Sequence, residues 1–309
     1  MYTYLKKDIS ILAGPSSSDL AIKIAKNLKD IADLVPVDVD IFSDGESKIK
    51  INKDIRKKHC IIVQSTYPPT DRHLIQMLMM IKKCTGDGAL NICAIIPYLA
   101  YARQDKVFLE GEIVSIELVA KLLEAVGTTR LVTVDVHSKR ALSYFTIDIQ
   151  NVSSVPLLAN YAANNIKITR PIVVSPDKGG AERAEEFARI LKTDMIALNK
   201  FCDKNTGEVT IDEKLNFDIS NRDIILVDDM ISTGGSIIKA CEVLKKNRCN
   251  KIYAMCAHAL LIEDALQKIK ATDVVEDIIT TNSIPNECTI FDLSPILSYA
   301  IRKAITPSR

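Results

Sequence analysis

Short apolar runs alternate along this chain with longer segments whose apolar residues recur at helical spacing. The short runs are typical of buried strands, and the longer segments are typical of amphipathic helices. We predict strands at 9–13, 60–63, 92–96, 131–136, 172–175, 224–227 and 252–256, and helices at 20–28, 74–82, 115–126, 182–191, 236–246 and 263–269. Because strands and helices alternate from end to end, the pattern predicts the α/β class with mainly parallel sheets.

The same order of elements occurs twice along the chain. Residues 13–18 follow the first predicted strand and lead into a helix, and residues 174–180 do the same early in the second half. Residues 60–66 occupy the place in the first half that residues 224–229 hold in the second. The repeat therefore predicts two similar domains, of which only the second keeps the acids and glycines.

A length of 309 residues suits two domains of ordinary size, and the repeat places their boundary near residue 150. The N-terminal domain would comprise residues 1–150 together with a final apolar helix in 292–309, which would return to pack on it. The C-terminal domain would comprise residues 151–291.

The composition argues against nucleic acids and membranes as partners of this chain. Forty basic and thirty-nine acidic residues give no overall charge that would attract nucleic acid or a membrane surface. Residues 1–10 contain no apolar signal core, and no apolar run is long enough to span a bilayer. None of the eight cysteines stands at Cys-x-x-Cys spacing, which argues against a zinc ribbon or a redox motif. We expect a cytoplasmic protein that binds neither nucleic acid nor membrane.

The most informative segment is Ile-Leu-Val-Asp-Asp-Met-Ile-Ser-Thr-Gly-Gly at 225–235. Its apolar run predicts a strand that ends at Val227, after which come Asp228 and Asp229, a polar turn, a glycine pair and a helix. Ligands bind where parallel strands end, and the amides of such a turn favour a phosphate. A capped surface turn is the alternative, but capping needs one acid and no glycine pair. We predict a sugar-phosphate site, with phosphate on the amides and sugar hydroxyls on the acids.

A second candidate binding segment follows the predicted strand 92–96. Arg103 offers a planar fork of donors that suits phosphate oxygens, and Gln104 can donate and accept toward a purine edge. The structural alternative is a solvated loop in which Arg103 pairs with Asp105.

His137 ends the predicted strand 131–136, and alternation would place it on the same side as Asp135. A histidine at the end of a strand can ligate a metal ion or donate to a backbone carbonyl. Both interpretations stay open at this point.

Residues 42–46, Phe-Ser-Asp-Gly-Glu, form a turn by composition. Their two acids could receive an amino group or a ribose, and Phe42 could stack on a base. The structural alternative is the tip of a hairpin.

Residues 176–180, Pro-Asp-Lys-Gly-Gly, join a predicted strand to a helix. The glycine pair predicts a second set of amides for anionic oxygens, with Asp177 available for Mg²⁺.

Lys200 follows the short apolar run 195–198 and precedes the polar stretch 203–208, which suggests an exposed mobile loop. A lysine there is either solvated or closes over phosphates when the loop moves.

Taken together, these segments resemble the ribose-phosphate pyrophosphokinase family, also called phosphoribosyl pyrophosphate synthetases. The resemblance covers nearly the whole chain and rests on five motifs in the family's order: FSDGE at 42–46, YARQDK at 101–106, DVH at 135–137, VVSPDKGG at 173–180 and ILVDDMISTGG at 225–235. It implies two similar domains, each with a fold like that of the type I phosphoribosyltransferases.

The resemblance also implies roles for the matched residues. ATP would be bound by Phe42, Asp44, Gly45, Glu46, Arg103 and Gln104. Ribose 5-phosphate would be bound by Asp228, Asp229, Ser232, Thr233, Gly234, Gly235 and Ser236. The pyrophosphate loop would be Asp177, Lys178, Gly179 and Gly180, with His137 and Asp177 contacting Mg²⁺ or its water shell. Lys200 would be the catalytic residue that stabilises charge in the transition state.

The implied reaction transfers the pyrophosphoryl group of ATP to the C1 hydroxyl of ribose 5-phosphate, giving 5-phosphoribosyl 1-pyrophosphate and AMP. Mg²⁺ would be the cofactor, and the product would supply nucleotide, histidine and tryptophan biosynthesis. Residues 42–46 would reach into a neighbouring subunit's ATP site, so we expect a homo-oligomer of at least two chains.

One position departs from the family pattern. Cys202 stands where the family usually has an arginine two residues after the loop lysine, and Lys204 is the nearest substitute. The departure favours one alternative, a non-catalytic relative that regulates an active enzyme. The other alternative is a phosphoribosyltransferase, which would share residues 228–235 but would not need Arg103, Gln104 and His137.

Overall fold

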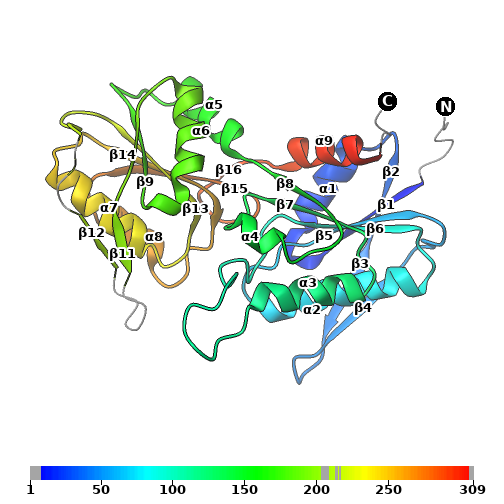
Figure 1. Cartoon of the computed structure of the whole chain (residues 1–309). Helices are drawn as coiled ribbons and strands as arrows, with labels where there is room; N and C mark the ends of the chain where they lie inside the picture. Colours follow the sequence, from blue (N-terminus) through cyan, green and yellow to red (C-terminus); the bar gives the residue numbers. More distant parts are fainter. Residues whose placement is uncertain (1–7, 203–208, 213–214, 216, 306–309) are drawn as a thin grey trace. The chain divides into compact units, whose positions relative to one another are not determined.

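The computed structural model describes residues 8–202, 209–212, 215 and 217–305, and the side chains of 200–202, 209–211 and 305 fall outside that description. The chain forms two compact units (Figure 1). Unit 1 comprises the described residues up to Val152 together with those from Asp292 onward, and unit 2 comprises Ser153–Phe291.

Each unit is built on one six-stranded sheet whose strands are all parallel. In unit 1 the strand order is β2 (Ala32–Val35), β1 (Ile9–Ala13), β5 (His59–Val63), β6 (Asn91–Ile96), β7 (Arg130–Val134) and β8 (Asp148–Val152). In unit 2 the order is β10 (Met195–Ala197), β9 (Ile172–Ser175), β13 (Ile224–Ile231), β14 (Ile252–Ala259), β15 (Val275–Thr281) and β16 (Thr289–Phe291). The predicted α/β class with parallel sheets is confirmed.

Every helix in the described part of the chain except α9 stands between two strands in the sequence. Unit 1 contains α1 (Ser18–Asn27), α2 (Thr70–Gly86), α3 (Ser115–Ala125), α4 (Lys139–Leu142) and α9 (Ser294–Ile305). Unit 2 contains α5 (Val155–Asn165), α6 (Ala181–Leu191), α7 (Gly235–Lys246) and α8 (Ala265–Lys270). Short 3₁₀ turns, Pro15–Ser17 and Lys178–Gly180, precede α1 and α6. Two hairpins complete the chain, β3 (Val37–Ile41) with β4 (Ser47–Ile51), and β11 (Lys200–Cys202) with β12 (Val209–Ile211).

The predicted repeat is visible in the strand order of the two sheets. The sequence of connections from β1 to β8 in unit 1 matches that from β9 to β16 in unit 2, including a hairpin after the second strand. β5 lies between β1 and β6 as β13 lies between β9 and β14. The two halves of the chain are therefore built on one plan.

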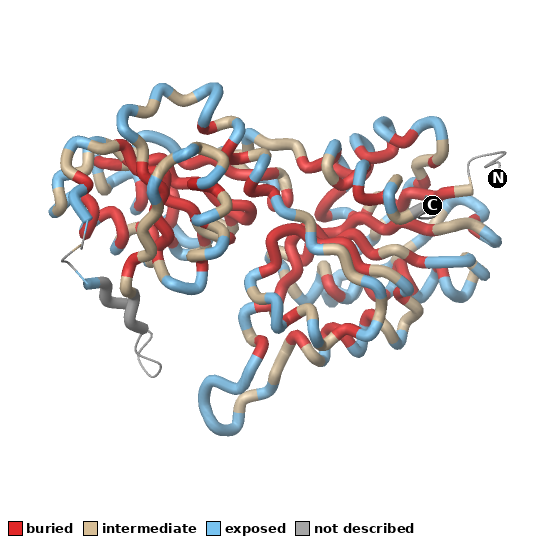
Figure 2. The backbone as a smooth tube through the Cα atoms, turned by 45° about the horizontal axis from the view of Figure 1, so that its top comes forward, coloured by how far each residue is buried: buried red, intermediate tan, exposed pale blue. Residues whose placement is uncertain are grey.

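Apolar side chains from helices and strands form the cores, and the central strands are buried along most of their length (Figure 2). In unit 2 successive residues of β13 point to opposite faces of the sheet. Leu226 packs with Ile237 in the cluster that includes α7 and α8, and Ile225 packs with Phe187 in the cluster that includes α5 and α6. Each such buried side chain stabilises the fold by about 1.5–3 kcal/mol.

Helix α9 returns from the end of the chain to α1. Asn27 Nδ2 donates to Ser294 Oγ and Ser298 Oγ, each at 3.3 Å. The guanidinium of Arg302 donates to both carboxylate oxygens of Asp30, at 2.6 and 2.9 Å. In unit 2, α5 packs on α6 as α9 packs on α1 in unit 1. Helix α5, however, precedes the sheet of unit 2 in the sequence.

Three predicted strands end at other residues than expected, and one of them, β14, continues past Cys256 to Ala259. β13 continues past Val227 to Ile231, and Asp228 pairs with Cys256 of β14 in the parallel ladder. β7 stops at Val134, because Asp135 has a φ of 37°, which a β-strand does not allow. None of the helices in the described part of the chain combines the length and hydropathy that a membrane span requires.

Candidate functional site

The acid pair lies inside strand β13. The prediction that the strand ends before the acids is wrong, because the backbone of Asp228, Asp229 and Met230 remains extended beside β14. The side chain of Asp228 accepts a hydrogen bond from the backbone N–H of Asp229 at 2.9 Å. Asp229 is buried, with 4% of its surface exposed. The two acids are thus linked by a hydrogen bond near the carboxyl end of a central strand, and the charge of Asp229 acts on Asp228.

Arg183 lies next to this pair, although nothing in the sequence analysis pointed to it. Its Nη1 is 3.7 Å from Asp229 Oδ1, and both side chains are largely buried. Burial raises the pKa of Asp228 well above its ordinary value, the negative charges of Asp229 and Asp177 raise it further, and Arg183 opposes them. The site therefore concentrates negative charge around one partly compensating guanidinium.

The loop after the acids ends in a glycine-dependent turn at the start of α7. Gly234 has a φ of 80°, and a Cβ built on it would lie 3.1 Å from Ile269 Cδ1. No side chain caps the helix, whose first i to i−4 bond runs from Ile238 N–H to Gly234 O at 2.9 Å. The amides of the first turn, beginning at Gly235, have no acceptor within an α-helix. This end of α7 thus presents backbone donors beside Ser232, Thr233 and Ser236.

In the second glycine turn, residues 177–180, backbone N–H groups donate hydrogen bonds to the side chain of Asp177. Asp177 Oδ1 accepts hydrogen bonds from the N–H groups of Gly179 at 2.8 Å and Gly180 at 3.2 Å. In this structure the Asp177 carboxylate accepts from these amides, and the expectation that they receive an anion of the substrate stays a prediction. Gly180 also packs against Ser175, since a Cβ there would lie 2.5 Å from Ser175 Oγ. The turn fixes Asp177 and leaves Lys178 exposed.

In unit 1 the segment after β6 is organised around Glu112. Its Oε2 accepts from Gln104 Nε2 at 3.1 Å and from the backbone N–H groups of Phe108 and Leu109 at 2.8 and 3.0 Å. These backbone donors lower the pKa of Glu112. Arg103, beside Gln104, is exposed.

The hydrogen bonds of Asp105 are made to residues other than Arg103, its partner in the solvated-loop alternative. Its carboxylate accepts a hydrogen bond from Ser138 Oγ at 2.5 Å, and its backbone carbonyl accepts from Tyr144 Oη at 2.9 Å. These bonds join the segment after β6 to the segment after β7. Arg103 stands two residues before Asp105, and His137 stands next to Ser138. The two residues therefore lie on adjacent loops at the carboxyl edge of the same sheet.

His137 does not continue a strand. Because β7 ends at Val134, the expected alternation of Asp135 and His137 does not apply. Asn151 Oδ1 accepts from Val136 N–H at 3.1 Å, and Ser138 caps α4 by accepting from Arg140 N–H. His137 is exposed in unit 1, whereas Asp177 lies in unit 2. Across the described residues, no group of three or more potential metal ligands is present.

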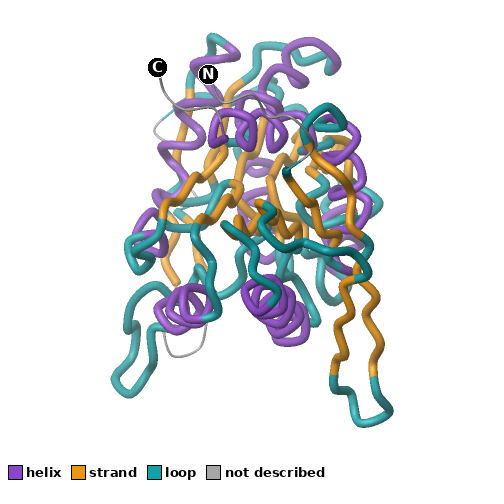
Figure 3. Tube along the Cα trace, turned by 90° about the vertical axis from the view of Figure 1, so that its right-hand side faces the viewer, coloured by secondary structure: helices purple, strands orange, loops and turns teal. Residues whose placement is uncertain are grey.

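Residues 42–46 form the tip of the β3–β4 hairpin, which extends from the body of its unit (Figure 3). Phe42 N–H donates to Glu46 O at 2.8 Å, and Glu46 N–H donates to Asp44 Oδ1 at 3.1 Å. Gly45 has a φ of 91°, which explains glycine at this position. The hairpin-tip interpretation is confirmed, and it leaves the Phe42 ring 51% exposed.

Lys200 begins β11, and Cys202 pairs with Val209 of β12. The side chains of Lys200 and Cys202, and all of residues 203–208 including Lys204, lie outside the described part of the structure. The roles expected of them stay predictions.

Models of known protein families match residues in both units. Residues 9–127 match the model for the N-terminal domain of ribose phosphate pyrophosphokinase, and residues 155–290 match the model for the phosphoribosyl transferase domain. A ribose-phosphate pyrophosphokinase of Sulfurisphaera tokodaii is 33% identical over 294 residues, which cover 94% of this chain and 99% of the relative. The chain belongs to the ribose-phosphate pyrophosphokinase family.

Other relatives agree with this assignment. The ribose-phosphate pyrophosphokinase of Haemophilus influenzae is 34% identical over 308 residues, covering 96% of each chain. The crystal structure of phosphoribosylpyrophosphate synthetase from Mycobacterium smegmatis superposes with a TM-score of 0.85 at 27% identity, covering 96% of this chain and 98% of that one. The predicted family and its two phosphoribosyltransferase-like domains are confirmed.

Proposed function

We propose that this chain catalyses the reaction for which its relatives are named. It transfers the pyrophosphoryl group of ATP to the C1 hydroxyl of ribose 5-phosphate, producing 5-phosphoribosyl 1-pyrophosphate and AMP. One observation carries the proposal: a chain with both family domains has an acid pair, Asp228 and the buried Asp229, just before a helix start that presents backbone donors. The product would feed the synthesis of nucleotides, histidine and tryptophan.

Ribose 5-phosphate fits the end of β13. The 5-phosphate would bind the first-turn amides of α7 together with the hydroxyls of Ser232, Thr233 and Ser236, because a helix N-terminus favours an anion. The ribose hydroxyls would donate to Asp228 and Asp229. Gly234 and Gly235 would allow the phosphate to approach the backbone.

ATP would be bound by unit 1. Arg103 and Gln104 stand at the carboxyl edge of its sheet, where ligands of parallel sheets gather. The exposed Phe42 ring would stack on adenine, and Asp44, Gly45 and Glu46 would complete the base site in a neighbouring chain. That arrangement requires a homo-oligomer of at least two chains.

The donor set fits Mg²⁺. This ion is usually held by one or two carboxylates together with substrate phosphates and water, and Asp177 supplies a carboxylate that the N–H groups of Gly179 and Gly180 fix in place. Asp177 and His137 would hold the ion. When bound, Mg²⁺ would neutralise phosphate charge.

The chain's own residues would align the reactants and balance their charge. Asp228 and Asp229 would fix the ribose so that its C1 hydroxyl oxygen attacks the β-phosphorus in line with the departing AMP oxygen. The hydroxyl proton is released, and the bond from the α-phosphate bridging oxygen to the β-phosphorus breaks. Lys178 would bind the transferred group, while Lys200 and Arg103 would stabilise its negative charge. Such a transfer needs no nucleophilic side chain.

The thiols support a cytoplasmic location. Seven cysteines in the described part of the chain are free, and four of these are buried. Free thiols persist in a reducing compartment, so we place the enzyme in the cytoplasm.

The direct test incubates the chain with ATP, Mg²⁺ and ribose 5-phosphate and follows both AMP and 5-phosphoribosyl 1-pyrophosphate. We expect both products in equal amounts, and we expect Asp228→Ala to abolish them. Asp277→Ala, which removes an exposed carboxylate of the same unit, is the matched control. Absence of AMP from both the wild type and Cys202→Arg would favour the regulatory relative. Consumption of 5-phosphoribosyl 1-pyrophosphate with a free base, without AMP formation, would favour a phosphoribosyltransferase.

A further inference from the structure

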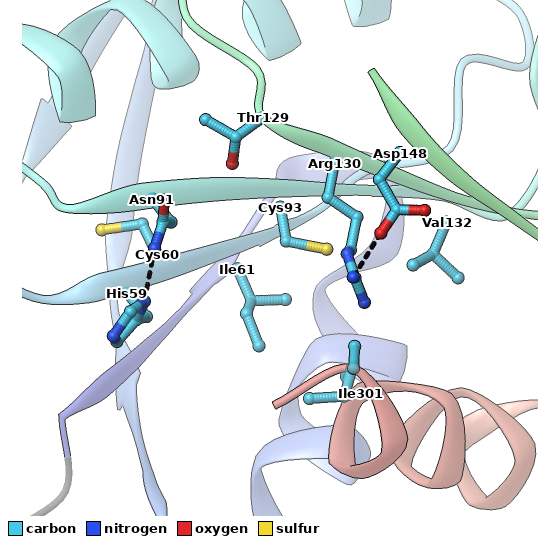
Figure 4. A pocket seen from close by; sticks show the side chains of 11 residues that line it. His59, Cys60, Ile61, Asn91, Cys93, Thr129, Arg130, Val132, Asp148 and Ile301 are labelled. Carbon is cyan, nitrogen blue, oxygen red and sulfur yellow. Dashed lines mark hydrogen bonds and ion pairs between the residues drawn. The ribbon is translucent and has the colours of Figure 1, made fainter. Parts of the chain in front are cut away.

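Unit 1 contains a pocket away from the carboxyl edge of its sheet. The pocket has a volume of about 410 Å³ and is lined by residues of β5, β6, β7, β8 and α9 (Figure 4). Four of its polar side chains stand at the first residue of a strand: His59, Asn91, Arg130 and Asp148. Because the strands are parallel, these residues share the amino edge, whereas Arg103 and His137 follow the carboxyl ends.

The lining has two rows. Residues two positions apart on a strand face the same side of a sheet. Ile61, Cys93 and Val132 therefore lie on the same face as the polar residues that start their strands, and Ile301 of α9 covers that face. A polar row at the mouth thus precedes an apolar row deeper under the helix.

The polar row consists of two internally matched pairs. The Nδ1 atom of His59 is 3.1 Å from Asn91 Nδ2, and Arg130 forms an ion pair with Asp148. The Arg130 charge is cancelled by its partner, so the row does not select an anion by net charge. It offers both donors and acceptors to the edge of a neutral molecule.

The apolar row is chemically inert. Burial raises the pKa of the Cys93 thiol to about 12, so at physiological pH it is a protonated thiol. A protonated, half-buried cysteine packs as a small apolar side chain and is a poor nucleophile. With Ile61, Val132 and Ile301 it forms a wall suited to the face of a flat ring.

We propose that this pocket binds a small, uncharged, planar nitrogen heterocycle of the size of a nucleobase. The ring faces would contact the apolar row, and ring nitrogens and exocyclic groups would exchange hydrogen bonds with His59 and Asn91. The volume is in the lower part of the range for small-molecule sites, which fits one unphosphorylated base. This site is separate from the ATP and ribose 5-phosphate sites and does not depend on the proposed reaction.

Calorimetric titration of the full chain with adenine, and separately with uracil, tests the proposal in the presence of saturating ATP. Ala304→Trp on α9 would fill the pocket, and Lys303→Trp, at the neighbouring exposed position, is the matched control. We expect at least one base to bind, with affinity reduced at least tenfold by Ala304→Trp and unchanged by Lys303→Trp. Binding should also be unchanged in Arg103→Ala, which removes a residue of the proposed ATP site.

Three results would overturn the proposal: no binding of either base, binding that Ala304→Trp leaves unchanged, or binding that Arg103→Ala abolishes. Tighter binding of AMP than of adenine in Arg103→Ala would also overturn it, because an anion would then be preferred. If Ala304→Trp fails to fold by circular dichroism, Asn91→Leu replaces it. Asn91 is exposed at the start of β6, and its loss should weaken base binding without affecting the fold.

Discussion

The guanidinium of Arg183 lies 3.7 Å from the carboxylate of Asp229 across the space between α6 and β13. The contact connects the helix that follows the Asp177 turn to the strand that carries the acid pair. It explains how three carboxyl groups, Asp177, Asp228 and Asp229, are tolerated close together. Arg183 is thus placed to position Asp229 for the sugar.

Replacing Arg183 by alanine should weaken the use of ribose 5-phosphate more than the use of ATP. Removal of one partner from a largely buried ion pair costs about 3–5 kcal/mol in interaction energy, although water would recover part of it here. We expect the KM for ribose 5-phosphate to rise about tenfold or more, with a smaller change in the KM for ATP. Steady-state kinetics measure both, and Arg183→Lys should recover part of the loss. Equal increases in the two KM values would contradict the positioning role.

Asp228→Asn should abolish activity and stabilise the fold at neutral pH. The pKa of Asp228 is raised in the folded chain, so the wild type loses stability as the pH rises from its ordinary value of 3.8 through the raised value. The asparagine variant does not undergo this loss and keeps the oxygen that accepts from Asp229 N–H. We expect a higher Tm than wild type at pH 7, by about 2–4 °C for each kcal/mol relieved, with the difference shrinking toward pH 4. Thermal unfolding across that range, with Asp277→Asn as the control, measures it; a difference independent of pH would refute the explanation.

Gly234→Ala should damage the phosphate end of the site, whereas Gly235→Ala should not disturb the fold. At Gly234 the φ of 80° and the 3.1 Å approach to Ile269 both oppose a side chain, which costs about 1–3 kcal/mol. At Gly235 an added Cβ would meet only Thr233 Oγ1, at 3.9 Å. We expect a lower Tm in the first variant alone, and a higher KM for ribose 5-phosphate in both, because each added Cβ stands where the phosphate would approach the backbone. Chemical denaturation and kinetics on both variants test this, and similar losses of stability would exclude the backbone explanation.

Phe42→Ala should raise the KM for ATP by about tenfold, because stacking of a base on an aromatic ring contributes about 1–3 kcal/mol. Ile41→Ala, which truncates the neighbouring exposed side chain on the same hairpin, should have little effect. If the hairpin completes a neighbour's site, activity per chain should also fall on dilution below the dissociation constant of the oligomer. Activity proportional to concentration at all dilutions, with the oligomer shown to dissociate, would argue against a shared site.

Much of the architecture could be predicted from local sequence pattern. β1 and β9 have the predicted bounds, since each is a short apolar run that leads into a turn with proline. The end of β13 could not be read in this way, because Asp228 and Asp229 interrupt the apolar pattern while their backbone stays in the ladder with β14. Hydrogen bonding to a neighbouring strand decides that extension, and it has no local signature.

The candidate site shows the same limit. The acid pair and the glycine turn were recognisable from adjacent residues, whereas the approach of Arg183 to Asp229 arises only when α6 packs beside β13. The Asp177 bonds to Gly179 and Gly180 had a local signal, because an aspartate two residues before a glycine commonly accepts from the following amides. Contacts between distant residues are set by tertiary packing, and these were the ones that the sequence did not reveal.

Helix α9 makes the folding of unit 1 depend on a segment that is synthesised after unit 2. Strands β1 to β8 leave the ribosome before unit 2, whereas α9, which packs on α1, follows unit 2. Unit 2, by contrast, is continuous, with α5 preceding its sheet. The second half of the chain can therefore complete its fold while the first still exposes the apolar surface of α1. A nascent chain truncated before Ser294 should for this reason depend on chaperones more strongly than the finished protein.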